Sequence, residues 1–239
     1  MSFVSFVEDV FMESDFSEIV QIARTRGNAY RLLSRLWGIE IDAELWQQLQ
    51  ATSFPELPEA PELNVAYRQL KRALQEPAAQ ALPALAADYA VMCLGADQTD
   101  GADPYESVHR SKDHIMMQDE WEQVLCLYAE LGLERSNRTK EPEDHLALEL
   151  DCMAHLCERE AEALEGARPD EAGWAADRQR EFLDKHLLLW VPSFAHEVLR
   201  LAHAEFYRAI AIITREQLIL DRALLDELTA PAEVQARGI

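Results

Sequence analysis

The sequence predicts an all-α fold, a bundle of about eight to ten helices, and three observations lead to this prediction. Apolar residues recur at steps of three, four and seven along most of the chain, which is the period of a helix face. No segment alternates apolar and polar residues as a half-buried strand does. Glycine and proline number only 8 and 10 among 239 residues, whereas an all-β chain needs many tight turns.

The first half of the chain divides into four predicted helices. The first ends at Gly38, and its apolar face comprises Ile19, Ile22, Ala23, Tyr30, Leu33, Leu36 and Trp37. Asp42 is placed to cap a short helix that runs through Leu49. Three prolines predict a loop over 52–61, and a helix over 63–74 follows it. Pro77 opens the fourth helix, which runs to Gly95, and Pro83 predicts a break or a later start near Ala84.

The second half alternates polar loops with further helices. Loops are expected over 96–103, 135–140 and 166–173, where polar residues or glycine interrupt the apolar pattern. Helices are expected over 116–131, from Pro142 through Leu164, over 175–189 and from Pro192 onward. Pro142 suits a first turn, and Glu143 and Asp144 would lie near the positive end of that helix dipole.

Composition and charge exclude several classes of function. Hydrophobic residues make up 49% of the chain, enough for a core without metals or disulfides. The 22 basic residues face 44 acidic ones, and the net charge of −22 argues against nucleic-acid binding and against an anionic membrane surface. The same charge would steer a basic partner toward the protein, or it simply keeps the protein soluble.

The sequence predicts a cytoplasmic protein with reduced cysteines. No basic residue precedes Arg24, and acidic residues interrupt the apolar start, so we expect no secretory signal. No stretch is long and apolar enough for a membrane span. The four cysteines lie in apolar, helix-like stretches and are interpreted as buried thiols; they are Cys93, Cys126, Cys152 and Cys157.

Most motifs that would carry catalysis are missing from the sequence. Cys152 and His155 could share a helix face, but Cys157 points elsewhere and no second cluster completes a zinc site. Glycine-rich phosphate loops and a nucleophile elbow are absent. We therefore predict no enzymatic activity, no metal and no cofactor.

Two segments stand out against this background. Asp103–Val108 places an aromatic ring beside a proline, with Glu106 and Ser107 adding an acceptor and a donor. Glu141–His145 places three acids around a proline and ends in a histidine; composition alone would make it an ordinary helix cap. Its surplus negative charge is also suited to a cation.

At these two segments the chain resembles the TorD/DmsD family of cytoplasmic chaperones for molybdenum-containing redox enzymes exported by the twin-arginine route. Glu-Pro-Glu-Asp-His at 141–145 is similar to the family signature, and 104–108 is similar to a second family segment. Further matches follow the family order: Asp88-Tyr89, Leu94-Gly95, His186-Leu187, Trp190, Phe194 and Phe206-Tyr207. Met92-Cys93 departs from the pattern, since many members have Leu-Phe there.

The resemblance implies an all-helical domain over 1–239 whose two helical parts meet at a hinge, with a possible subdivision near 96–103 or 133–141. It implies binding rather than catalysis, by a monomer or by a homodimer that exchanges helical parts. The implied partners are the twin-arginine signal peptide and the apo form of a molybdenum-containing reductase subunit. Nucleic acid and stable membrane insertion are not expected.

A twin-arginine signal has a basic start and an apolar centre, so a receptor must satisfy both. We expect an apolar groove lined by Tyr89, Met92, Pro104 and Tyr105. The arginines would face Glu106, Glu141 and Asp144, and His145 would orient Asp144 or bind a peptide carbonyl. Ser107 and Pro142 complete the predicted peptide-binding set. Two alternatives remain: an acidic helical module for an unrelated basic helix, and a helical enzyme built on Asp144 and His145.

Overall fold

A computed structural model describes residues 13–94, 101–134 and 140–229. In that part of the chain every regular element is helical, which confirms the predicted fold class. The elements are α2 (Glu13–Gly38), α3 (Ala43–Ala51), α4 (Pro61–Ala73), α5 (Ala78–Cys93), α6 (Glu106–Arg110), α7 (Asp119–Glu130), α8 (Leu146–Glu165), α9 (Pro169–Phe182), the π-helical turn η1 (Leu183–Leu187), α10 (Leu188–Leu201) and α11 (Glu205–Thr229). None of the described helices is both long and apolar enough to cross a bilayer.

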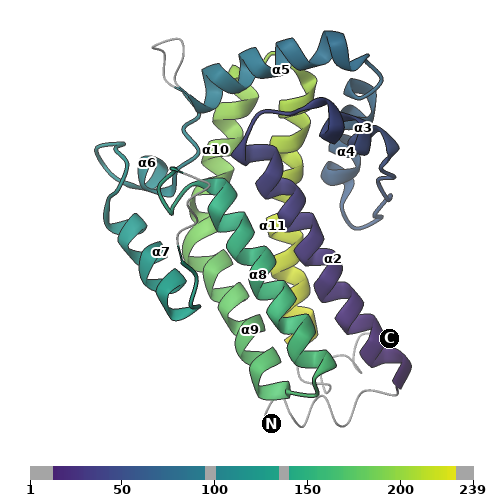
Figure 1. Cartoon of the computed structure of the whole chain (residues 1–239), viewed down its shortest axis with the longest axis vertical. Coiled ribbons are helices and arrows are strands. Elements are labelled where there is room, and N and C mark those ends of the chain that lie inside the picture. The colour runs from purple at the N-terminus through teal and green to yellow at the C-terminus, as the bar shows by residue number, and fades with distance from the viewer. Residues whose placement is uncertain (1–12, 95–100, 135–139, 230–239) are drawn as a thin grey trace.

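The long helices form the body of the molecule. Figure 1 shows α2, α8, α9 and α11 running along its long axis, with α10 continuing the line of α9 through the turn η1. α2 packs against α8, α8 against α9, and α10 against α11. The short helices α3, α4 and α5 gather at one end, and α6 and α7 lie on one side (Figure 1).

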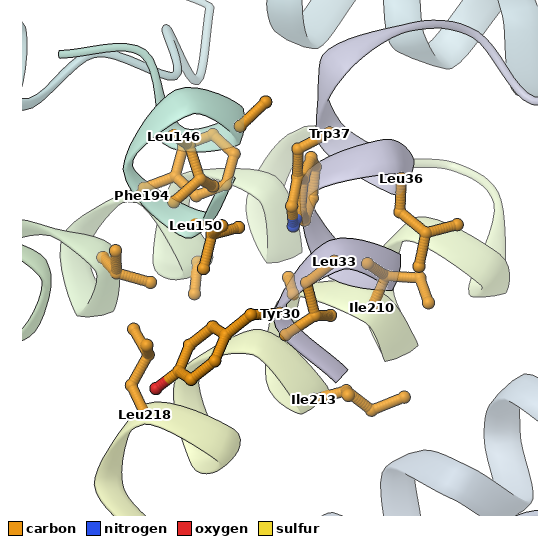
Figure 2. Close-up of a cluster of buried hydrophobic side chains, with 14 of the residues drawn as sticks. Tyr30, Leu33, Leu36, Trp37, Leu146, Leu150, Phe194, Ile210, Ile213 and Leu218 are labelled. Atoms are coloured by element: carbon orange, nitrogen blue, oxygen red, sulfur yellow. The ribbon is translucent and has the colours of Figure 1, made fainter. Parts of the chain in front are cut away.

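The second half of the predicted apolar face of α2, from Tyr30 to Trp37, is buried in the main core, whereas Ala23 is buried in a smaller second cluster against which Ile19 packs. Figure 2 shows Leu33 and Trp37 among Leu150 of α8, Phe194 of α10 and Ile210 of α11, and the Tyr30 ring directed toward Leu218 of α11. The Trp37 ring meets the Phe194 ring edge-on, with 4.9 Å between centroids. Its indole N–H donates to Thr214 Oγ1 at 3.0 Å, so this buried polar group is satisfied.

A buried ionic network ties α2 to the last helix. Arg26 donates to both carboxylate oxygens of Asp221, at 2.5 and 3.0 Å, and to Glu160 at 3.1 Å. Tyr30 OH donates to the same Asp221 at 2.7 Å. All four side chains are buried, so each charge depends on its partners rather than on water.

The two helix breaks predicted from proline are wrong. α5 continues through Pro83, and α10 continues through Pro192. Both prolines are exposed, so the carbonyl that each leaves without a helical donor can bind water. The chain breaks instead after α10, where Asp88 Oδ2 accepts from the N–H groups of His203 (2.9 Å) and Ala204 (2.6 Å). This side-chain cap begins α11 at Glu205.

Other boundaries agree in part with the predictions. Asp42 caps α3 as predicted, accepting from the Leu45 N–H at 2.8 Å. The helix predicted over 116–131 begins only at Asp119, because Met117 has a positive φ of 60°. Residues 96–100 and 135–139 of the predicted loops lie outside the described residues.

Three of the four cysteines are buried free thiols, as predicted; they are Cys93, Cys152 and Cys157. Cys126 is exposed, which corrects the prediction for that residue. It lies on α7, a helix at the side of the bundle whose one fully buried side chain is that of Val124.

Candidate functional site

The two segments singled out in the sequence lie side by side. Tyr105 and His145 form an isolated antiparallel bridge. The Glu106 N–H donates to the Asp144 carbonyl at 3.0 Å, and the Leu146 N–H donates to the Pro104 carbonyl at 2.8 Å. We call residues 103–107 with 141–146 the bridge junction. It joins the start of α6 to the start of α8, which more than thirty residues of the sequence separate.

The bridge also corrects the predicted start of α8. Residues 141–145 form a turn rather than a first helical turn, and α8 begins at Leu146. Residues 104–106 bond to the Asp144 carbonyl and to the Leu146 N–H. A helix that began at Pro142 would use these two groups in its own backbone hydrogen bonds, so they could not pair with residues 104–106. Residues 103–108, expected to be irregular, include the start of the short helix α6.

A buried polar clasp holds the junction closed. Ser107 donates to Asp144 Oδ2 through its N–H at 3.0 Å and through Oγ at 2.5 Å. Ser107 Oγ accepts in turn from the Met117 N–H at 3.1 Å, which ties the loop after α6 to the same point. Burial raises the pKa of Asp144 above its usual value, although the bonds from Ser107 oppose that shift.

His145 caps α8 and packs against Tyr105. Its Nδ1 accepts from the Ala147 N–H at 3.0 Å, and the Tyr105 ring meets the imidazole edge-on at 5.1 Å. Burial lowers the pKa of His145 to about 4, so the ring is neutral near pH 7 and can act as this acceptor.

Three members of the junction reach the surface; besides Asp103 they are Tyr105 and Glu141, which bond to each other. Both are partly exposed, and Tyr105 OH donates to Glu141 Oε2 at 2.5 Å. Burial and the Glu141 carboxylate raise the pKa of Tyr105, so its hydroxyl stays protonated and donates. The junction therefore presents an aromatic ring beside a carboxylate.

Beneath the junction lies a pair of buried carboxyl groups. Glu106 accepts from His186 Nδ1 at 2.8 Å and forms an ion pair with Arg110. Glu149 of α8 accepts from the Trp190 indole N–H at 3.0 Å. Burial, followed by the nearby Glu106, raises the pKa of Glu149 well above its usual value, so the surroundings favour the protonated form of this carboxyl group.

Sequence reasoning missed Glu149, although a signal was present. Glu149 follows Leu146 by three residues and precedes Met153 by four, so it falls within the apolar stripe of the helix. An acid in such a stripe must be buried with partners or neutral.

The predicted apolar residues lie behind the junction. Tyr89 is 5% exposed and Met92 is 0% exposed, and Pro104 is buried with them. Tyr89 OH donates to the Trp37 carbonyl at 3.2 Å, which holds its ring against the core. These three side chains are therefore buried and do not form an exposed groove in this structure.

An exposed apolar strip beside the junction was not predicted. Ile115, Met116 and Met117 are each about half exposed, at 51, 50 and 52%. The strip is anchored where the Met117 N–H bonds to Ser107. Flexible methionine side chains are common on surfaces that adapt to varied partners.

The described residues hold no cluster of three or more His, Cys, Asp or Glu side chains suited to a metal ion. Cys152 and Cys157 are buried, and burial raises their pKa values, whereas His155 is exposed.

Comparison with known proteins finds one matching family and several relatives that are named chaperones. Residues 57–196 match the family described as nitrate reductase delta subunit. "Chaperone protein TorD" of Vibrio cholerae serotype O1 (strain El Tor Inaba N16961) is 33% identical over 144 residues, 60% of this chain. The match spans 63% of that relative, less than two thirds of its length. Proteins of the same name are 29% identical over 219 residues in Shewanella sp. (strain ANA-3), covering 87% of this chain and 97% of the relative, and 28% identical over 220 residues in Ferrimonas balearica, covering 90% and 96%.

Proposed function

Since the chain belongs to the nitrate reductase delta subunit family and its relatives are named TorD chaperones, we propose that it is a chaperone for a redox enzyme. A chaperone role involves binding and no catalysis. In its finer form, the proposal is that the protein binds the twin-arginine signal of a molybdenum-containing reductase subunit. It would hold the apo subunit until its cofactor is inserted and would so prevent early export.

The pairing of Tyr105 with Glu141 at the surface of the junction carries this proposal. An arginine side chain can donate two parallel hydrogen bonds to a carboxylate and can stack its planar guanidinium on an aromatic face. Tyr105 supplies the aromatic face and Glu141 the carboxylate, with 2.5 Å between Tyr105 OH and Glu141 Oε2. They lie where two separate segments of the chain meet. One arginine of the signal would contact this pair.

The buried members of the predicted set would position this pair. Asp144 and Glu106 are 0% exposed and already accept bonds inside the protein, so in the closed junction they support the surface from below. Ser107 and His145 join the two segments, and Pro142 is buried in the turn that carries Glu141.

The apolar centre of the signal needs a separate contact. The exposed Ile115–Met117 strip supplies one without rearrangement, whereas the predicted groove at Tyr89, Met92 and Pro104 would require a rearrangement, because all three side chains are buried. Burying ~300 Å² of apolar surface would yield roughly 7 kcal/mol gross, much of it offset by ordering the peptide.

The cleft between α7 and η1 adds negative charge nearby. It has a volume of about 550 Å³, and its lining carries four acids against two basic residues; they are Asp119, Glu122, Glu130 and Glu181, with Arg178 and Lys185. His186, which also lines the cleft, bonds to Glu106 beneath the junction. Together with the net charge of −22, these acids would speed the encounter with a basic peptide, and salt would reduce the effect.

Calorimetric titration with a twin-arginine signal peptide tests the proposal. Glu141→Gln removes one charged acceptor and should weaken binding about tenfold, and Tyr105→Ala should weaken it by a similar factor. Glu171→Gln is the matched control, because Glu171 is an exposed acid paired with Arg168 on the distant α9. If neither variant changes affinity by more than about 0.5 kcal/mol, the site is misplaced.

Two peptide controls separate this proposal from a general acidic module. Replacing both peptide arginines by glutamine should abolish most of the binding. A scrambled peptide of equal charge should bind more weakly; equal affinity would favour a module that recognises any basic amphipathic segment.

A further inference from the structure

The cleft between α7 and η1 has one wall that carries negative charge without a cation. α7, which lies at the side of the bundle in Figure 1, contains four acids and no lysine or arginine. Three of these acids line the cleft from one side of the helix; they are Asp119, Glu122 and Glu130. None of their carboxylates forms an ion pair within the part of the chain that the structure describes.

The helix itself accounts for only part of this charge. Asp119 and Glu122 lie in the first turn, where the helix dipole favours an acid, but they are three residues apart and repel each other. Glu130 ends the helix, where the dipole disfavours an acid. The two basic residues across the cleft are already paired with Glu181. A bound cation would therefore relieve repulsion that the protein does not relieve itself.

A histidine that is almost fully buried also lines the cleft. His186 is 7% exposed, and its Nδ1 bonds to Glu106 Oε2 at 2.8 Å. Its Nε2 has no hydrogen-bond partner among the described residues, yet it is not sealed from solvent as the unpaired Trp46 Nε1 is. The free edge of the imidazole is thus open to the cleft.

The bond to Glu106 fixes which role this free nitrogen has. Glu106 also forms an ion pair with Arg110, so it is a carboxylate and can only accept. Nδ1 of His186 therefore carries the proton and donates, and in the neutral ring Nε2 is left as an acceptor. Nε2 and the three carboxylates of α7 all need a hydrogen-bond donor.

The chemistry of the cleft indicates its ligand. No three acids, histidines or cysteines of the described chain lie close enough together for a metal ion, so the donor is an organic cation. Arginine has five N–H donors in one plane and can bond to separate acceptors at once. Its methylene groups can pack on Leu127 and Phe182, which line the same cleft.

We propose that this cleft binds an arginine side chain of a polypeptide through Nε2 of His186 and the carboxylate of Glu122. In the proposed function the acids of α7 only attract the peptide from a distance, whereas here they contact it. That the arginine belongs to the redox subunit rests on the proposed function. It is a different arginine from the one at Tyr105 and Glu141.

Nuclear magnetic resonance of the full chain with ¹⁵N-labelled histidine tests the site, and His186→Gln identifies the His186 signals by their loss. At about pH 7.5, Nε2 should be unprotonated, and the tripeptide acetyl-Gly-Arg-Gly-amide should shift its signal. The uncharged citrulline tripeptide should bind about tenfold more weakly. The signals of His196, which is exposed on α10, should stay in place. A protonated Nε2, or no shift at about 5 mM arginine tripeptide, would overturn the proposal.

Two exposed or partly exposed acids of α7 supply a matched pair of variants. Glu122→Gln removes a charge from the cleft and should weaken binding of the arginine tripeptide about threefold. Glu120→Gln makes the same change on the same helix, but Glu120 does not line the cleft, so the affinity should not change. Equal affinities for the two variants would also contradict the proposal.

Glu141→Gln separates this site from the bridge junction. The arginine tripeptide should still shift the His186 signal in this variant; loss of the shift would place the arginine at the junction and overturn the proposal. If Glu141→Gln leaves signal-peptide affinity intact while the tripeptide still shifts His186, the proposed function fails at the junction and the cleft site stands. If Glu141→Gln weakens the signal peptide but the tripeptide never shifts His186, only the cleft site fails.

Discussion

The clasp between Ser107 and Asp144 allows a quantitative prediction. In Asp144→Ala the protein loses two hydrogen bonds to a buried carboxylate, each contributing about 1.5–3 kcal/mol when the acceptor is charged. The Ser107 N–H is then left without its acceptor. Part of this loss is offset, because the raised pKa of Asp144 shows that burying its charge already costs free energy.

We expect a net loss of about 3 kcal/mol in the free energy of unfolding. For a chain of this size, that corresponds to a decrease in Tm of roughly 6–12 °C. Urea titrations measure the loss in the wild type, Asp144→Ala, Ser107→Ala and the double variant. The comparison requires that the slope of the free energy of unfolding against urea concentration be the same for all four proteins. The two single changes should not add, and their coupling should exceed about 1 kcal/mol.

Asp113→Ala serves as the control for this experiment. Asp113 lies in the exposed turn after α6, and its replacement should change stability by less than about 0.5 kcal/mol. If Asp144→Ala also cost less than about 0.5 kcal/mol, the clasp would not hold the junction closed. The same would follow if the losses of Asp144→Ala and Ser107→Ala simply added in the double variant.

Three further predictions concern buried titratable groups. Glu149 has a higher pKa in the folded than in the unfolded chain, so the wild type loses stability as pH rises above about 4.3, and Glu149→Gln should be the more stable protein by a margin that grows as pH rises from that point. A margin independent of pH, in urea titrations, would contradict the raised pKa of Glu149. His145 has the opposite shift, so the wild type should lose stability as pH falls from about 6.5 to about 4, by up to about 1.4 kcal/mol per pH unit. His145→Asn keeps a capping acceptor and should flatten that decline; parallel curves would count against a buried neutral imidazole. Asp221→Ala leaves Arg26 buried without its main partner and should cost about 3–5 kcal/mol, whereas the exposed Asp226→Ala should cost less than about 1 kcal/mol. Similar losses for both, measured by thermal unfolding, would show that Arg26 finds another partner.

Features encoded within a few residues could be predicted from the sequence. The apolar face of α2, its end at Gly38 and the cap at Asp42 depend on spacing and side-chain chemistry within one or two helical turns. The two segments of the junction were also visible, because a proline, an aromatic residue and several acids stand out in a helical chain.

Proline positions were less informative than expected. Pro83 and Pro192 lie inside helices because solvent can satisfy the carbonyls they leave free. The actual break before α11 depends on Asp88, a residue 115 positions from His203, whose N–H it accepts. No local pattern indicates a cap that comes from so far along the chain.

The sequence by itself determined the helical class, most helix faces and the two segments that make the candidate site. Only the tertiary structure decided that Glu106 and Asp144 are buried and that Tyr105 and Glu141 remain at the surface. Periodicity reports which face of a helix is apolar, through side chains three and four residues apart. The burial of a charge depends on partners from distant elements, such as His186 for Glu106, and packing alone brings them together.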